Sequence, residues 1–136
     1  MLAGYSGTPL PKKLGIKPRS VVALLHAPKN FEQVLGRMPE GVKVKQAHNS
    51  DCDLTLWFAK SQVEINREVR RLAKAIGDGK IWIAWPKKAS RVPTDLTQQF
   101  VREAGLAAGL VDFKICAIDD TWSALLFTRR KQQVKL

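Results

Sequence analysis

The chain has 136 residues, of which 45% are hydrophobic and 26% are charged, which predicts one globular domain with its own core. The 23 Lys and Arg residues outnumber the 12 Asp and Glu residues, and the resulting net charge of +11 favours anionic partners such as nucleic acid or an acidic protein. No apolar run approaches the roughly 20 residues that a membrane-spanning helix needs, which excludes a membrane protein of that kind.

The predicted elements alternate between strand and helix. Apolar runs predict strands, and apolar side chains at helical spacing, bounded by capping residues and glycines, predict helices. In chain order we expect a helical turn at 10–14, a strand at 21–25, a helix at 31–35, strands at 42–45 and 52–59, a helix at 62–76, a strand at 81–85, a helix at 95–108 and a hairpin of strands at 111–118 and 122–128.

Three patterns locate the helix starts. Ser61 and Glu64 form an S-x-x-E capping box, and Asn30 and Gln33 resemble one. Thr94 is the predicted N-cap of the last helix. Each of these helices is therefore predicted to begin shortly after a strand ends.

This order of elements defines a fold class. It predicts an α/β protein with a mainly parallel sheet between two helical layers, a Rossmann-like three-layer sandwich that closes with a C-terminal antiparallel hairpin. No internal repeat or low-complexity linker interrupts the chain. We therefore expect a single domain over residues 1–136, with an N-terminal arm at 1–19 and a basic tail at 129–136.

The turn after the first predicted strand departs from the usual pattern of this class. Nucleotide-binding α/β domains carry glycines there, so that the backbone can approach a phosphate or an adenosyl group closely. Here the turn reads His26-Ala27-Pro28-Lys29-Asn30, which contains no glycine, and Pro28 removes one N–H donor. The sequence predicts a cofactor-type scaffold without the usual means of holding a cofactor.

The cysteines and histidines bear on metal and redox chemistry. Cys52 and Cys116 each lie in an apolar run, which predicts two buried thiols without a disulfide in a reducing compartment. His26 and His48 are the two histidines, and no Cys, His or carboxylate cluster has metal-ligand spacing, so we expect no metal. The first ten residues are too short and polar for a signal peptide, and we expect a cytoplasmic protein.

Several strings resemble those of known families. Residues 14–18 (LGIKP), residues 77–84 (GDGKIWIA) and the closing hairpin are similar to segments of class I methyltransferases. More specific strings resemble a bacterial family classed as a domain of unknown function, namely residues 3–10 (AGYSGTPL), 12–18 (KKLGIKP), 85–90 (WPKKAS) and 121–123 (TWS). These resemblances imply a trimmed methyltransferase-like fold in a bacterial protein and no particular activity.

Departures from the methyltransferase pattern argue against S-adenosylmethionine. Methyltransferases have a glycine loop where residues 26–30 stand here, and they often place an acidic residue where Lys45-Gln46-Ala47 stands. Their acceptor-binding position after the fourth strand corresponds to Lys60-Ser61-Gln62, and one helix–strand unit is missing between residues 44 and 52. We therefore expect no adenosyl cofactor.

The carboxyl ends of the predicted parallel strands define the candidate site. Ligands of open parallel sheets gather at this edge, and helix N-termini beside lysines favour anions. Three predicted helix N-termini, near Asn30, Ser61 and Thr94, point to this edge. The side chains expected there are His26, Lys29, Lys60, Lys87, Lys88, Ser90, Asp119 and Asp120. The alternative is that Lys87 and Lys88 only solubilise a surface loop.

Aromatic and titratable residues could extend this site. Trp85 and Trp122 could flank the edge and stack on bases, and packing in the core is the alternative. His26 could be a base or a phosphate ligand, or only a satisfied polar group. Asp119 could be a general base or a metal ligand, although adjacent acidic residues, here Asp119 and Asp120, are also typical of a turn.

A second basic feature lies on the predicted helix over residues 62–76. One face carries Arg67, Arg70, Arg71 and Lys74, and like charges four residues apart cost roughly a few tenths of a kcal/mol per pair. This stripe could bind phosphates or an acidic partner, and a solvated helix face is the alternative.

Taken by itself, the sequence predicts a non-catalytic binding module for an anionic partner, with nucleic acid as the first candidate. The alternative is an enzyme that acts on a phosphate-bearing or adenosyl substrate, with His26 or Asp119 as the base. A third interpretation is an assembly protein whose apolar edge strand pairs with itself or another chain, which leaves a homo-oligomer open.

Overall fold

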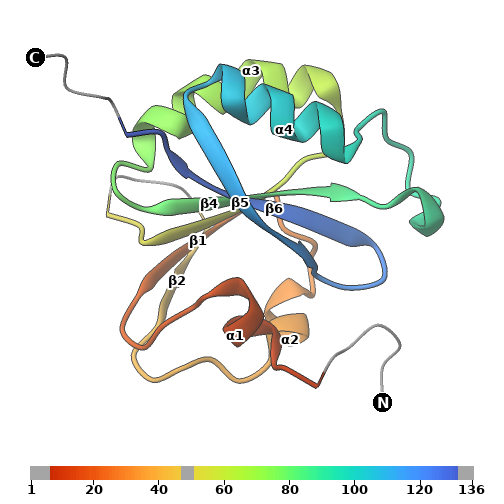
Figure 1. Ribbon diagram of the computed structural model, residues 1–136. Coiled ribbons are helices and arrows are strands. Elements are labelled where there is room, and N and C mark those ends of the chain that lie inside the picture. The colour runs from red at the N-terminus through yellow and green to blue at the C-terminus, as the bar shows by residue number, and fades with distance from the viewer. Residues whose placement is uncertain (1–6, 47–50, 132–136) are drawn as a thin grey trace, which may run out of the picture.

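The computed structural model describes residues 7–46 and 51–131, which form a sheet between two layers of helices (Figure 1). The elements are α1 (Leu10–Leu14), β1 (Val21–Leu25), α2 (Phe31–Leu35), β2 (Lys43–Lys45), β3 (Leu54–Phe58), α3 (Gln62–Ala75), β4 (Lys80–Pro86), the 3-10 turn η1 (Lys88–Ser90), α4 (Gln98–Ala107), β5 (Leu110–Ala117) and β6 (Trp122–Arg129). Residues 1–6, 47–50 and 132–136, which include His48 and parts of the predicted arm and tail, lie outside the described residues.

The architecture confirms the predicted fold class. Within the described ranges, six strands lie in the order β2-β1-β3-β4-β6-β5. The first four strands are mutually parallel, and β6 runs antiparallel to both β4 and β5. Figure 1 shows α3 and α4 over one face of the sheet and α1 and α2 over the other. The chain goes from β1 to β2 on one side and then to β3 on the other side of β1, so the topological switch lies between β1 and β3.

Aromatic side chains occupy much of the core beneath α1 and α2. Phe58 contacts Phe31 and Trp122 edge to face, with ring centroids 4.8 Å and 5.0 Å apart. The buried Trp82 donates its indole N–H to the carbonyl oxygen of Leu14 at 2.9 Å. This bond joins α1 to β4, so the N-terminal segment from Leu10 onward packs into the core.

The capping box at the start of α3 is confirmed. The Ser61 Oγ accepts the backbone N–H of Glu64 at 3.1 Å, and the Glu64 Oε1 accepts the N–H of Lys60 at 3.1 Å. The capping box predicted for α2 is wrong, because the Asn30 side chain makes no capping hydrogen bond. A capping box therefore forms at α3 and not at α2.

The predicted start of α4 is wrong by several residues. Thr97 is the N-cap, and its Oγ1 accepts the N–H of Phe100 at 3.1 Å. Thr94 instead donates its hydroxyl to the Lys60 carbonyl oxygen at 2.7 Å. The Thr94 Oγ1 also accepts the N–H of Leu96 at 3.1 Å, so this side chain stabilises the loop before α4 and links it to the start of α3.

The outer strand of the hairpin, β5, contains a one-residue bulge. Asp112 pairs with Phe127 and Lys114 pairs with Leu126, so Phe113 lies between them without a partner on β6. β5 also ends the sheet, so its other edge carries no strand among the residues that the structure describes. Phe113 is therefore an extra residue on an open edge.

None of the helices within the described ranges combines the length and the apolar character that crossing a membrane requires.

Candidate functional site at the carboxyl edge of the sheet

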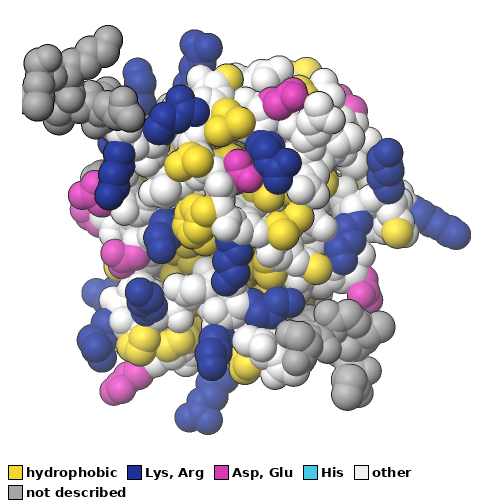
Figure 2. Space-filling view, in the orientation of Figure 1, with side chains coloured by type: hydrophobic (Ala, Val, Ile, Leu, Met, Phe, Trp, Pro, Cys, Tyr) yellow, Lys and Arg dark blue, Asp and Glu magenta, His cyan; other side chains and the backbone are white. Residues whose placement is uncertain are grey.

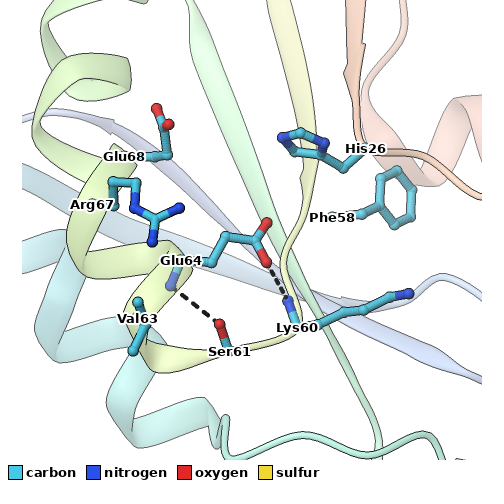
Figure 3. A pocket seen from close by; sticks show the side chains of 8 residues that line it. All are labelled: His26, Phe58, Lys60, Ser61, Val63, Glu64, Arg67 and Glu68. Atoms are coloured by element: carbon cyan, nitrogen blue, oxygen red, sulfur yellow. Dashed lines mark hydrogen bonds between the residues drawn. The ribbon is translucent and has the colours of Figure 1, made fainter.

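A cavity of about 530 Å³ opens at the topological switch, between the end of β1 and the start of α3 (Figure 3). It lies where ligands bind in open parallel α/β sheets. Its lining residues are His26, Phe58, Lys60, Ser61, Val63, Glu64, Arg67 and Glu68. The cavity therefore brings the end of β1 together with the first two turns of α3.

His26 makes the turn that a glycine usually makes after the first strand. Its φ of +57° lies in the left-handed region, which side-chain-bearing residues seldom adopt. Such a conformation costs roughly 1 kcal/mol or more and concentrates at functional sites. Its imidazole is exposed and points toward α3 in Figure 3. The turn thus keeps a glycine-like backbone while placing a titratable ring at the cavity.

Two of the first three backbone N–H groups of α3, those of Gln62 and Glu64, are already bound within the chain. Besides the Ser61 and Glu64 bonds of the capping box, the Asp95 Oδ1 accepts the N–H of Gln62 at 2.9 Å. Free N–H groups are what make a helix start attractive to an anion. α3 therefore offers an incoming anion less than the sequence predicts.

The cavity wall that α3 supplies carries both signs of charge. Arg67 points toward the cavity in Figure 3 and makes no ion pair with a described residue. Glu68 accepts a hydrogen bond from Arg71 Nε at 2.9 Å, and Glu64 adds a second carboxylate. The sequence pattern assigns Glu64 to the capping box and does not place Glu68 at the site. Their spacing from Ser61 by one and two helical turns was the available signal.

Only part of the predicted basic set lines this cavity. Lys60 contributes to the wall, but Figure 3 shows its side chain extending away from His26 and Arg67. Lys29 lies exposed in the loop after β1, and Lys88 lies exposed in η1 after β4. These cations follow the ends of neighbouring strands at one edge of the sheet. Apart from Arg67 of the α3 stripe, the predicted site residues that line the cavity are His26 and Lys60.

The loop after β4 and the hairpin turn are held together by hydrogen bonds. Lys87 donates its backbone N–H to the Thr121 carbonyl oxygen at 2.7 Å. Ser90 donates its hydroxyl to the Lys87 carbonyl oxygen at 2.6 Å, which closes η1. Asp119 Oδ1 accepts the N–H groups of Thr121 and Trp122, both at 2.8 Å. Ser90 and Asp119 therefore stabilise turns, as the alternative interpretation of Asp119 predicts.

The two tryptophans of the predicted site pack in the core. Trp85 and Trp122 are 6% and 5% exposed, and they belong to the hydrophobic clusters on opposite faces of the sheet. The packing interpretation is confirmed, and neither ring presents a face on which a base could stack.

The basic stripe of α3 divides between two environments. Arg67 lines the cavity, whereas Arg70 and Lys74 are exposed and make no ion pair with a described residue. Arg71 is paired with Glu68. The stripe therefore does not act as one surface directed to a single site.

The two cysteines are buried and form no disulfide, as predicted. Burial raises the pKa of the Cys116 thiol above its ordinary value, and the nearby ammonium groups of Lys13, Lys114 and Lys87 lower it in part. Over residues 7–46 and 51–131, no group of His, Cys, Asp and Glu side chains gathers in the number that a metal site needs.

Solved structures with similar folds include methyltransferases. A protein from Sulfolobus solfataricus assigned to the type 11 methyltransferases has a TM-score of 0.63 at 13% identity, with 93% of each chain covered. The PH0226 protein of Pyrococcus horikoshii OT3 has a TM-score of 0.58 at 9% identity, covering 89% of this chain and 86% of its own. The N,N-8-amino-8-demethyl-D-riboflavin dimethyltransferase of Streptomyces davawensis has a TM-score of 0.51 at 16% identity, covering 82% and 42%.

At these identities the likeness shows the fold alone, which is a methyltransferase-like α/β fold. No family model matches the chain, and no curated protein matches it in sequence.

Proposed function

We propose that the protein is a non-catalytic binding module whose partner is nucleic acid. The supporting observation is the uncompensated charge of the carboxyl edge. Within the part of the chain that the structure describes, Lys29, Lys60, Lys87 and Lys88 form no ion pair. Ammonium groups without carboxylate partners remain available to phosphates, whose binding releases condensed counterions.

An extended polyanion fits this edge better than a small anion in the cavity. A small anion between His26 and α3 would meet the carboxylates of Glu64 and Glu68, and the N–H groups of Gln62 and Glu64 are occupied. The loops that follow β1, β3 and β4 lie in sequence across the sheet, and each carries at least one lysine. A phosphate backbone that crosses the strand ends would meet these loops in turn.

Salt dependence tests this function. Four phosphate contacts give a slope of about −3 in log affinity against log salt, so binding weakens about 60-fold between about 50 and 200 mM salt. Fluorescence anisotropy with a labelled oligonucleotide at several salt concentrations measures the slope. A flat response, or no binding at the lowest salt, overturns the proposal.

A charge-matched pair of variants locates the contact. The triple variant Lys60→Gln, Lys87→Gln and Lys88→Gln should lower the magnitude of the slope by about 2 to 3, because each lost phosphate contact removes roughly 0.7 to 0.9. The control variant Lys12→Gln, Arg70→Gln and Lys74→Gln removes the same charge at exposed positions of α1 and α3, outside the loops that follow β1, β3 and β4, and should change the slope much less. Equal losses in the two variants would mean that net charge, not the carboxyl edge, drives binding.

A second candidate function is that of an enzyme acting on a phosphate-bearing or adenosyl substrate. It is favoured by His26, whose strained backbone places its imidazole at a cavity that also contains Glu64 and Glu68. Calorimetric titration with S-adenosylmethionine and with common nucleotides distinguishes the two functions. Saturable micromolar binding that His26→Ala abolishes would favour the enzyme over the binding module.

A further inference from the structure

We propose that the amino edge of the sheet holds a second contact for nucleic acid, which binds one nucleotide of a single strand. The phosphate enters a basic cavity beside Lys17, Arg19 and Lys80, and the base stacks on Phe113. The ligand class rests on the proposed function, but the surface is a different one, at the opposite end of the parallel strands.

The basic cavity has a volume of about 450 Å³ and lies where β1, β3 and β4 begin. Three cations line it, namely Lys17, Arg19 and Lys80, and all three residues are exposed. None of them forms an ion pair with a residue in the described ranges. Asp53 is the single acidic residue of the lining. Its Oδ2 accepts the backbone N–H of Val21 at 2.8 Å, so this carboxylate is hydrogen-bonded to the first residue of β1.

The turn that presents two of these cations is fixed by the fold. Ser20 donates its hydroxyl to the Lys17 carbonyl oxygen at 2.7 Å, and Arg19 donates its N–H to the Glu40 carbonyl oxygen at 2.8 Å. Arg19 has a φ of +63°, a conformation that an arginine adopts only when its surroundings impose it. Gly41 makes room for it, because a Cβ there would lie 2.9 Å from the Arg19 Cγ. A fixed turn lowers the entropy cost of binding an anion.

Lys80 connects the basic cavity to an exposed aromatic ring. Its Nζ lies 5.5 Å from the ring centroid of Phe113, a cation–π distance. Phe113, the extra residue at the bulge in β5, is 53% exposed, although phenylalanine is among the residues most often buried. Proteins that bind single strands combine a basic groove with such exposed rings, because every base offers a flat face for stacking.

The surroundings favour a single strand over a second copy of this chain. Figure 2 shows hydrophobic side chains on the face that carries β5, with Lys and Arg side chains around them. A second copy would bring another net charge of +11 to this face. Lys114 and the bulge also oppose strand pairing along the free edge of β5. A single strand instead carries anionic phosphates and flat bases in turn. The basic cavity matches the phosphate, and the ring of Phe113 matches the base.

The test measures the anisotropy of a labelled oligothymidine and of a labelled duplex of equal length, both at low salt. Phe113→Leu keeps an apolar side chain and removes the aromatic face, so it should weaken binding of the single strand by about tenfold and leave the duplex nearly unchanged. Lys80→Gln should weaken both ligands. The matched control is Ile115→Leu, which changes a residue of the same strand that is also 53% exposed and should leave both affinities unchanged.

The outcomes separate this inference from the proposed function. If Phe113→Leu and Lys80→Gln leave binding intact while the carboxyl-edge triple variant weakens it, the amino-edge contact is refuted and the proposed function stands. If Phe113→Leu and Lys80→Gln weaken binding while the carboxyl-edge triple variant does not, the amino-edge contact is supported and the proposed role of the carboxyl edge is refuted. Wild-type protein that binds neither ligand refutes both. If sedimentation shows a dimer that Phe113→Leu dissociates, Phe113 serves a second copy and the nucleotide contact is refuted.

Discussion

The two ends of β1 share a backbone conformation and differ in their charge. Arg19 precedes the strand at a φ of +63°, and His26 follows it at +57°, so both ends carry a side chain in the left-handed region. At the carboxyl end the cavity includes Glu64 and Glu68, whereas at the amino end Asp53 is the sole acidic residue lining the basic cavity. The cavity at the amino edge therefore has fewer carboxylates beside its cations than the cavity at the carboxyl edge, where this fold class holds its ligands. A polyanion would contact both edges of the sheet, whereas a small cofactor of this fold class binds at the carboxyl edge.

Gly79 packs closely at the amino edge of the sheet, and its substitution should have the largest effect on stability. An alanine Cβ there would lie 2.7 Å from the Cys52 carbonyl oxygen and 3.0 Å from that of Ile76. Backbone atoms cannot move aside cheaply, so we expect Gly79→Ala to lower the free energy of unfolding by about 3 kcal/mol.

Its control is Gly77→Ala in the same turn. Gly77 has a φ of +56° and no atom within 4 Å of the added Cβ, so only backbone strain of about 1 kcal/mol applies. Urea unfolding measures both variants. Equal losses of unfolding free energy in the two variants would show that Gly79 is not closely packed and that the amino edge can adjust to the added Cβ.

The shared left-handed conformation is tested by comparing glycine and alanine at Arg19 and at His26. At each position the glycine variant should be more stable than the alanine variant by about 1 kcal/mol, because only the Cβ is strained at positive φ. At Arg70, within α3, the order should reverse by about the same amount, because alanine favours helix. Thermal and urea unfolding give the sign. If the alanine and glycine variants are equally stable at one end of β1, that end does not share the left-handed backbone conformation of the other end.

The smallest expected effect concerns the carboxyl edge alone. Ser61→Ala removes the cap of α3 and should lower the free energy of unfolding by about 0.5 to 1 kcal/mol, whereas Ser61→Asp should retain most of it. Urea unfolding compares the two variants. If the alanine variant keeps full stability, the N–H groups of α3 are not held by this cap, and the helix start is more open to an anion than its hydrogen bonds indicate.

The parts of the fold that local chemistry decides could be predicted from the sequence. The apolar run of β1 and the helix α2 have the predicted bounds, and the box of Ser61 and Glu64 forms as expected. The start of α4 could not be predicted in this way, since Thr94 and Thr97 are equally able to cap a helix. In the folded chain Thr97 Oγ1 accepts the N–H of Phe100, whereas Thr94 Oγ1 accepts that of Leu96 and donates to the Lys60 carbonyl oxygen, a long-range contact that the local sequence does not show.

The candidate sites depend on such long-range arrangements even more strongly. Strand order placed His26 and Lys60 at one edge correctly, but not the direction of the Lys60 side chain, which Figure 3 shows leaving the cavity. Nothing local connects Arg19 with Lys80, because only the parallel pairing of the strands brings their ends together. The sequence pattern places Phe113 in an apolar strand, and it reveals neither the bulge at this residue nor its 53% exposure.

The bond between Trp82 and Leu14 has a consequence for the order in which the chain folds. A helix as short as α1, which has five residues, cannot persist by itself in water. Its anchor on β4 lies 68 residues further along the chain. The short helix α1 can therefore settle only once β4 is present, so we expect it to form after the central strands with which it packs.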